Sequence, residues 1–170
     1  MQTSPRALID TFDIVADVLA GGDRPALYGA VDQALQALVG HKLFTLLMVL
    51  PGGKEVQRFW STNTDAYPLS GRKPMGDTPW GDLVIRRKKP FLGRNMDDIR
   101  WAFFDHELIA GLGLGSAINV PIIAQQTLLG TIALLDVEGH YDEEKLALAM
   151  RMAPYLVDAF RQEIAEAVLA

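Results

Sequence analysis

Cysteine is absent from all 170 residues of this sequence. Without thiols the chain cannot form disulfides, thiolate metal sites or a cysteine nucleophile. The sequence also lacks an apolar run near the ~18–20 residues that cross a bilayer. Its first residues have neither the basic start nor the apolar core of a secretory signal. These absences predict a soluble cytoplasmic protein with no membrane partner.

Positive charge is also scarce. The 16 Lys and Arg residues are outnumbered by 21 Asp and Glu residues, which gives a net charge of −5. A protein that binds nucleic acid needs a clustered basic face, so we expect no nucleic-acid partner. The basic run 86–89 ends a predicted helix, where the helix dipole favours cations by about 0.3–1 kcal/mol.

The composition is that of one folded domain. Apolar residues make up 49% of the chain, and a chain of this length buries roughly 70% of its unfolded surface. No internal repeat, low-complexity segment or linker interrupts the sequence. We therefore expect a single domain over residues 1–170.

Helices are predicted at both ends of the chain. Ser4 followed by proline is a favourable helix start, and the apolar residues that follow recur at helical spacing. This pattern predicts a helix within 1–22. A second helix is expected to begin at Asp23. The last helix is predicted over 142–168, and Pro154 is expected to kink it or to remove one backbone hydrogen bond.

Two pairs of strands are predicted between these helices. The first pair is 43–50 and 55–61, joined by a Pro-Gly-Gly turn. The second pair lies within 111–136, where two apolar runs flank a short polar turn. The segment 62–94 between the pairs is irregular, and its end, 90–93, is predicted as an edge strand that tolerates proline.

Two short helices are predicted in and after the irregular middle. The first is expected to begin at Asp77 or Thr78, whose side chains suit a helix cap. The second is expected to run as one segment from Asp97 or Asp98 toward Ile109. Their aromatic residues are candidates for a roof over the sheet.

Several short motifs occur in a fixed order around the second strand pair. They are Gly115-Ser116, Val120-Pro121, Leu129-Gly130 and Tyr141-Asp142-Glu143. With the order of helices and strands, they resemble the GAF domain family over roughly residues 25–160. The resemblance implies an α+β fold of the GAF, or profilin/PAS, type. In that fold the terminal helices pack on one face of an antiparallel sheet of about six strands, and short helices and loops roof a pocket on the other.

The two faces of the second strand pair differ, because side chains alternate along a strand. One face carries large branched residues suited to packing under helices. The other, which lines the ligand cavity in GAF domains, carries Ala117, Asn119, Thr131 and Ala133. Small side chains leave volume there, and Asn119 with Thr131 supplies hydrogen-bonding groups. Further candidate ligand-binding residues are Thr45, Phe59 and Ser61 in the first strand pair and Trp80, Trp101 and Phe104 in the roof.

Catalysis is not expected. One enzyme of this family, the free methionine-(R)-sulfoxide reductase, needs cysteines and carboxylates, but the matching carboxylate positions here hold Ala117, Ala133 and Leu135. Sulfoxide reduction and covalent bilin attachment both require a thiol, so both are excluded. The run 141–143 matches only half of the motif found in cyclic-nucleotide-binding GAF domains. The capped start of a helix explains the same residues.

No metal site or cofactor is predicted either. The three histidines stand alone in the sequence, which does not match the clustered spacing of metal ligands. His106 remains a remote candidate for a haem ligand.

Two functions remain open. The first is a non-catalytic sensor that binds a small organic ligand beside the sheet and signals through a partner protein. The second is a homodimeric interaction module with no physiological ligand, in which Ala117 and Ala133 merely let a roof helix approach the sheet. In either case, apolar stripes on the helices within 1–22 and 142–168 predict a homodimer through these helices.

Overall fold

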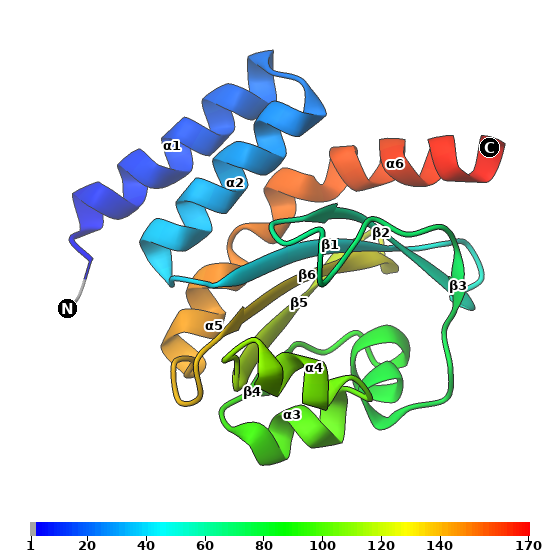
Figure 1. Ribbon diagram of the computed structural model, residues 1–170. Coiled ribbons are helices and arrows are strands. Elements are labelled where there is room, and N and C mark those ends of the chain that lie inside the picture. The colour runs from blue at the N-terminus through cyan, green and yellow to red at the C-terminus, as the bar shows by residue number, and fades with distance from the viewer. Residues whose placement is uncertain (1–2) are drawn as a thin grey trace.

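The computed structural model describes residues 3–170 and is built around one antiparallel sheet (Figure 1). Its six strands lie in the order β3-β2-β1-β6-β5-β4, so β1 and β6 are central and the two predicted hairpins lie side by side. The α+β architecture expected from the sequence is confirmed. The strands are β1 Leu43–Val49, β2 Glu55–Ser61, β3 Lys73–Pro74, β4 Phe91–Gly93, β5 Ser116–Ala124 and β6 Thr127–Asp136.

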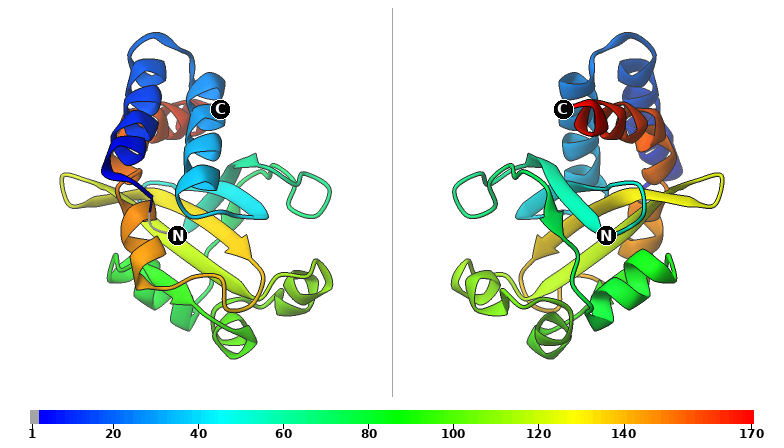
Figure 2. Two further views of the ribbon diagram at one scale, coloured as in Figure 1. Left: turned by 90° about the vertical axis from the view of Figure 1, so that its left-hand side faces the viewer. Right: turned by 90° about the vertical axis from the view of Figure 1, so that its right-hand side faces the viewer.

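The terminal helices cover one face of the sheet, which we call the helix face (Figures 1 and 2). Branched residues of β1, β5 and β6 pack there against the helices in a continuous apolar cluster. In the views of Figure 2, α1 and α2 stand side by side above the sheet. The elements of this layer are α1 Pro5–Gly21, α2 Arg24–Leu38, α5 Glu143–Met150, a 3-10 turn Ala153–Leu156 and α6 Val157–Leu169.

Three short helices lie on the opposite side, which we call the roof face (Figure 1). They are the π-helix η1 Gly81–Arg86, α3 Met96–Ala102 and α4 His106–Gly111. A second apolar cluster lies between them and the sheet. Among the residues described, none of the helices has the length and apolarity needed to span a membrane.

Side-chain caps fix the starts of the long helices as the sequence predicted. Ser4, Asp23 and Asp142 each accept a hydrogen bond from the backbone N–H three residues on. Tyr141 precedes the last of these caps, and its buried hydroxyl donates to the carbonyl of Gly40 at 2.8 Å. The cap of the final helix is therefore tied to the end of α2.

Two predicted helices are divided in the structure. The final helix, expected over 142–168, is interrupted by the 3-10 turn that contains Pro154, because this residue has no N–H to continue the helix. The predicted helix from Asp97 or Asp98 to Ile109 breaks at Phe103, whose backbone is extended with φ −125° and ψ 125°. Its start is also one turn earlier, where Asn95 caps α3.

The β5–β6 hairpin has the tight turn that two left-handed residues permit. Gln125 and Gln126 have φ of 49° and 68°, the geometry of a type I′ turn. Gly130 pairs with Met48 of β1, in a place where a methyl group would collide with the Leu47 carbonyl and the ring of Phe160. Glycine at this position therefore lets α6 approach the sheet closely.

Candidate functional site

The strand registers align two rows of side chains across the roof face. The strands β5, β6, β1 and β2 pair in this order, all antiparallel. Residues that lie directly opposite one another in successive strands form a row across all four. The first row is Asn119, Ala133, Thr45 and Ser61. The second row is Pro121, Thr131, Leu47 and Arg58. The rows bring most of the hydrogen-bonding candidates onto one surface.

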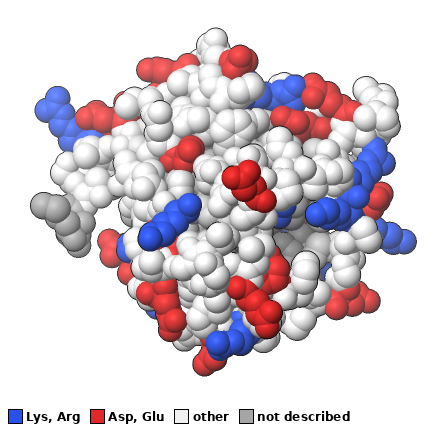
Figure 3. All heavy atoms as spheres, viewed as in Figure 1, with Lys and Arg blue, Asp and Glu red and all other residues white. Residues whose placement is uncertain are grey.

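The centre of the roof face is not fully covered. Leu47 and Ala133 belong to the two central strands, yet both are partly exposed, whereas the residues next to them in β1 and β6 are buried. They lie in adjacent rows, beside the buried hydroxyl residues Thr131 and Thr45. Figure 3, in the orientation of Figure 1, shows the surface hollowed to the right of centre, between the strands above and the roof helices below. Open space therefore reaches the middle of the sheet from this side.

Asn119 connects the sheet to the roof. Its side chain is only 2% exposed, and its amide oxygen accepts a hydrogen bond of 3.0 Å from the indole nitrogen of Trp80. Trp80 immediately precedes η1, so this contact holds the start of that helix over β5. The prediction that Trp80 belongs to the roof is confirmed, and part of the Asn119 amide is satisfied by the chain itself.

The other roof aromatics differ from the sequence prediction. Phe104 is 97% exposed, and Trp101 is 49% exposed and stacks on the outer side of Phe91. Both were expected to face the pocket, and both placements are wrong. Phe103 takes their place, with its ring 6.3 Å from Trp80 and 5.9 Å from Phe91. The extended backbone at Phe103 changes the direction in which Phe103 and Phe104 point, whereas Trp101 lies before the break on an exposed side of α3.

Phe59 also lies on the face opposite to the one predicted. Its ring contacts Tyr28 and Phe160 at centroid distances of 5.5 and 4.9 Å, within the helix-face cluster. A β-bulge is the cause, since Leu46 pairs with Trp60 while Leu47 pairs with Arg58, and Phe59 has no partner. Side chains that alternate between the two faces, counted back from Ser61, would place Phe59 on the roof face. The bulge breaks this alternation at Phe59.

Ser61, Thr45 and Ala117 lie on the roof face as predicted, with different surroundings. The Ser61 hydroxyl accepts a hydrogen bond from the backbone of Asn63 at 3.2 Å. Thr45 is buried beside the partly exposed Ala133. Ala117 is fully buried within the apolar cluster and pairs with Gly93 of β4, so it lies away from the open space.

Arg58 is a roof-face residue that the sequence reasoning missed. Its guanidinium lies 5.1 Å from the centre of the Tyr67 ring, and its Nη1 donates to the carbonyl of Pro68 at 3.2 Å. The Tyr67 hydroxyl donates in turn to Asp105 at 2.8 Å. Burial lowers the pKa of Arg58 and raises that of Tyr67. The available signal was a charged residue in the middle of a strand, followed directly by Phe59 and Trp60.

Within residues 3–170, no three His, Asp or Glu side chains gather in an arrangement that would hold a metal ion. His106 lies at the start of α4 and is partly exposed.

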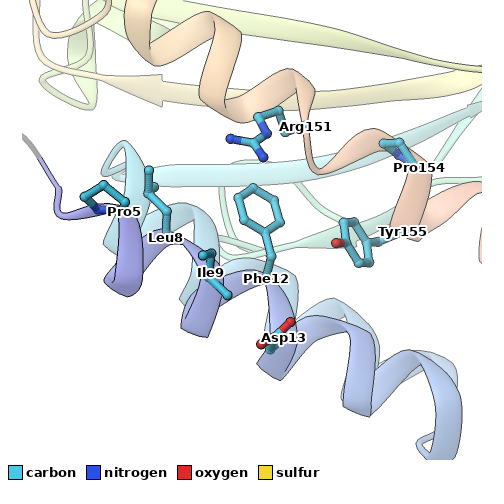
Figure 4. A pocket seen from close by; sticks show the side chains of 8 residues that line it. All are labelled: Pro5, Leu8, Ile9, Phe12, Asp13, Arg151, Pro154 and Tyr155. Atoms are coloured by element: carbon cyan, nitrogen blue, oxygen red, sulfur yellow. The ribbon is translucent and has the colours of Figure 1, made fainter.

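A second concavity lies on the other side of the molecule. It is a groove of about 690 Å³ between α1 and the 3-10 turn (Figure 4). Phe12 and Tyr155 stack at 5.9 Å across it, and the Arg151 guanidinium lies 5.0 Å from the Phe12 ring. The remaining lining residues are Pro5, Leu8, Ile9, Asp13 and Pro154.

Comparison with known proteins supports the fold. A family model described as GAF domain matches residues 26–161. No curated protein sequence matches the chain. The structure resembles the GAF domain of a phosphoenolpyruvate-protein phosphotransferase from Coxiella burnetii, with a TM-score of 0.77, 16% identity and coverage of 98% of this chain and 99% of that one.

Two further solved structures give the same result. The GAF domain of an Acinetobacter phosphoenolpyruvate-protein phosphotransferase has a TM-score of 0.72 at 12% identity, covering 96% of this chain and 97% of that one. The GAF domain of a two-component sensor histidine kinase from Bacillus halodurans has a TM-score of 0.64 at 14% identity, covering 83% and 98%. At these identities the likeness concerns the fold.

Proposed function

We propose that this chain, which belongs to the GAF domain family, is a non-catalytic sensor that binds a small organic ligand on the roof face of its sheet. The ligand occupies the space over Leu47 and Ala133, and the chain passes the signal on through a partner protein. The similar solved structures include GAF domains from phosphoenolpyruvate-protein phosphotransferases and from a two-component sensor histidine kinase, and the occurrence of this fold in a sensor kinase agrees with the proposed role.

The partial exposure of Leu47 and Ala133 is the observation that carries the proposal. A residue in a central strand beneath a roof is ordinarily buried, and a sheet face that served only as core would cover these two as well. The polar residues beside the opening, Thr45 and Thr131, would supply orienting hydrogen bonds. An apolar site with a few convergent polar groups is the usual form of a small-molecule pocket.

A thermal-shift screen with metabolites and aromatic acids tests the proposal. A ligand that binds the folded state raises the melting temperature by mass action. The variant Thr131→Val should weaken that shift, because it replaces a hydroxyl beside the opening. Thr127→Val is the matched control, since Thr127 is exposed at the start of the same strand. Equal loss in both variants, or no shift with any compound, would contradict a ligand site on the roof face.

A second proposal concerns the groove beside α1. We propose that it forms a homodimer interface with a second copy of this chain, because large apolar side chains are exposed along the same helix. Ile9 and Ile14 are each 60% exposed, and the aromatic walls of the groove offer a complementary surface. Sedimentation at tens of micromolar should show a dimer that Ile9→Glu dissociates. Leu69→Glu, on an exposed loop, should leave it intact, and a strict monomer would contradict the proposal.

A further inference from the structure

We infer that the ligand of the roof-face site is a small organic carboxylate and that Arg58 binds its carboxylate group. The inference rests on the proposed sensor function and adds the chemical class of the ligand. It follows from the position of Arg58, from the partners that this side chain has, and from the partner that it lacks.

The position of Arg58 relates it directly to the open space. It lies in the same row as Leu47 and Thr131. Leu47 is its direct partner in the neighbouring strand β1, and Thr131 lies one strand farther, in β6. Neighbouring strands are about 4.8 Å apart, so the backbones of Arg58 and Thr131 are roughly 10 Å apart. A ligand of the size of a small dicarboxylate or an aromatic acid spans that distance.

The partners of Arg58 differ from those of Arg24, the other partly buried arginine within residues 3–170. Arg24 pairs with two carboxylates, Glu163 at 3.3 Å and Glu166 at 2.5 Å. For Arg58, no carboxylate oxygen within residues 3–170 lies close enough for an ion pair.

The acidic group nearest to this cluster is already engaged. Asp105 accepts the Tyr67 hydroxyl, and Tyr67 presents its ring, which carries no charge, to the guanidinium. The buried Nε of Arg58 has no hydrogen-bond acceptor. Leaving a partly buried charge unpaired is unfavourable. An anion that binds the guanidinium would therefore lower the free energy of this side chain.

The geometry of the unpaired edge favours a carboxylate. Nη1 is bonded to Pro68, and the Nε and Nη2 edge of a guanidinium matches the two oxygens of a carboxylate. Nε is closed off from water in this arrangement, so the side chain must turn to reach the ligand. The bond to Pro68 that it would release is exposed, and exposed hydrogen bonds contribute little net free energy.

Calorimetric titration of the full chain with matched acids and amides tests the inference. The probes are glutarate with glutaramide, benzoate with benzamide, and inorganic phosphate. We expect an acid to bind at least tenfold more tightly than its amide, and more weakly as salt concentration rises. Preference for an amide, or equal affinity for phosphate, would overturn the carboxylate assignment.

Variants separate ligand binding from a structural role. Arg58→Gln should lose at least tenfold in affinity for the acid. Arg58→Lys should lose an intermediate amount, because lysine keeps the positive charge but lacks the planar guanidinium that offers two parallel N–H donors. Arg72→Gln, which removes an exposed arginine, should bind as the wild type does. The melting temperature of ligand-free Arg58→Gln should equal or exceed that of the wild type. A lowered melting temperature with unchanged affinity would show that Arg58 is structural.

The two proposals fail in different ways. If neutral compounds bind and Thr131→Val weakens them while Arg58→Gln does not, the sensor site stands and the carboxylate inference is wrong. If no compound of either class binds the wild type, both are wrong.

Discussion

The indole nitrogen of Trp80 donates a 3.0 Å hydrogen bond to the amide oxygen of Asn119, and both side chains are buried. This bond joins the residue that precedes η1 to strand β5 of the sheet. It is a direct contact between two side chains that are 39 positions apart in the sequence. The roof therefore has a fixed anchor at one end and open space farther along the sheet.

Trp80→Phe should destabilise the protein by about 1–3 kcal/mol, because it leaves the buried Asn119 amide without its donor. Phenylalanine is smaller than the buried indole, so the single variant combines a cavity with the lost hydrogen bond, and a double-mutant cycle is needed to separate the two. Urea unfolding of the two single variants and of the double variant with Asn119→Leu measures the coupling. If the single effects simply add, the two side chains do not interact energetically.

Ala133→Leu should be tolerated, whereas Ala117→Leu should destabilise by about 1–3 kcal/mol through overpacking. Both alanines lie on the roof face, but Ala133 is partly exposed and Ala117 is fully buried. Denaturant melts of the two variants therefore test whether the centre of the roof face is open. Equal destabilisation would mean that it is packed.

Gly130→Ala should destabilise by about 1–3 kcal/mol or more, since the added methyl meets a backbone carbonyl that cannot move aside. Gly29→Ala is the matched control. Gly29 lies within α2 with open space around it, so alanine there should stabilise by roughly 0.5–1 kcal/mol. Thermal melts of both variants would show opposite shifts, and a neutral Gly130→Ala would contradict the close approach of α6.

Alkaline pH should unfold the protein progressively above about pH 10. Burial is the largest cause that raises the pKa of Tyr28, Tyr67 and Tyr141, with nearby Glu163, Asp105 and Asp136 as further causes. A folded-state pKa above the unfolded value of ~10 gives stability that is complete below that pH and is lost as pH rises.

Tyrosinate absorbance followed against pH measures this effect. The buried Tyr28 and Tyr141 and the partly buried Tyr67 should ionise only as the circular dichroism of the fold is lost. Replacing Tyr28, which is bonded to Glu163 at 2.9 Å, with Phe should make stability less dependent on pH in this range. Early ionisation in an intact fold would show that these hydroxyls are accessible.

Local signals in the sequence were sufficient for most of the fold. Ser4, Asp23 and Asp142 act as caps through bonds to residues three positions away, and such short-range chemistry is visible in sequence. The strand β2 was predicted with its observed bounds, Glu55–Ser61, because it lies between clear turn residues. The resemblance to GAF domains then implied one antiparallel sheet of about six strands with the terminal helices on one face, and the structure has this arrangement.

The side-chain composition of the site was predicted less well, for two physical reasons. The bulge at Phe59 depends on how β2 pairs with β1, and pairing across strands is not encoded in the alternation of one strand. The break at Phe103 places Phe103 rather than Phe104 in the roof, and it is not visible in the helical periodicity that predicted one continuous segment. Both errors arise where tertiary contacts override local periodicity, and both change which side chains face the open space over the sheet.

The shortness of β4 has a consequence for how the protein behaves at high concentration. β4 pairs only with residues 117–119 of β5, which leaves the outer edge of that strand beyond Asn119 without a neighbouring strand. Exposed edges can recruit other chains into intermolecular sheets. Pro121 interrupts the row of donors along this edge, since proline has no N–H, and the Lys88 ammonium group binds the Gln126 carbonyl at the hairpin turn. A proline and a lysine thus make this edge a poor template for aggregation.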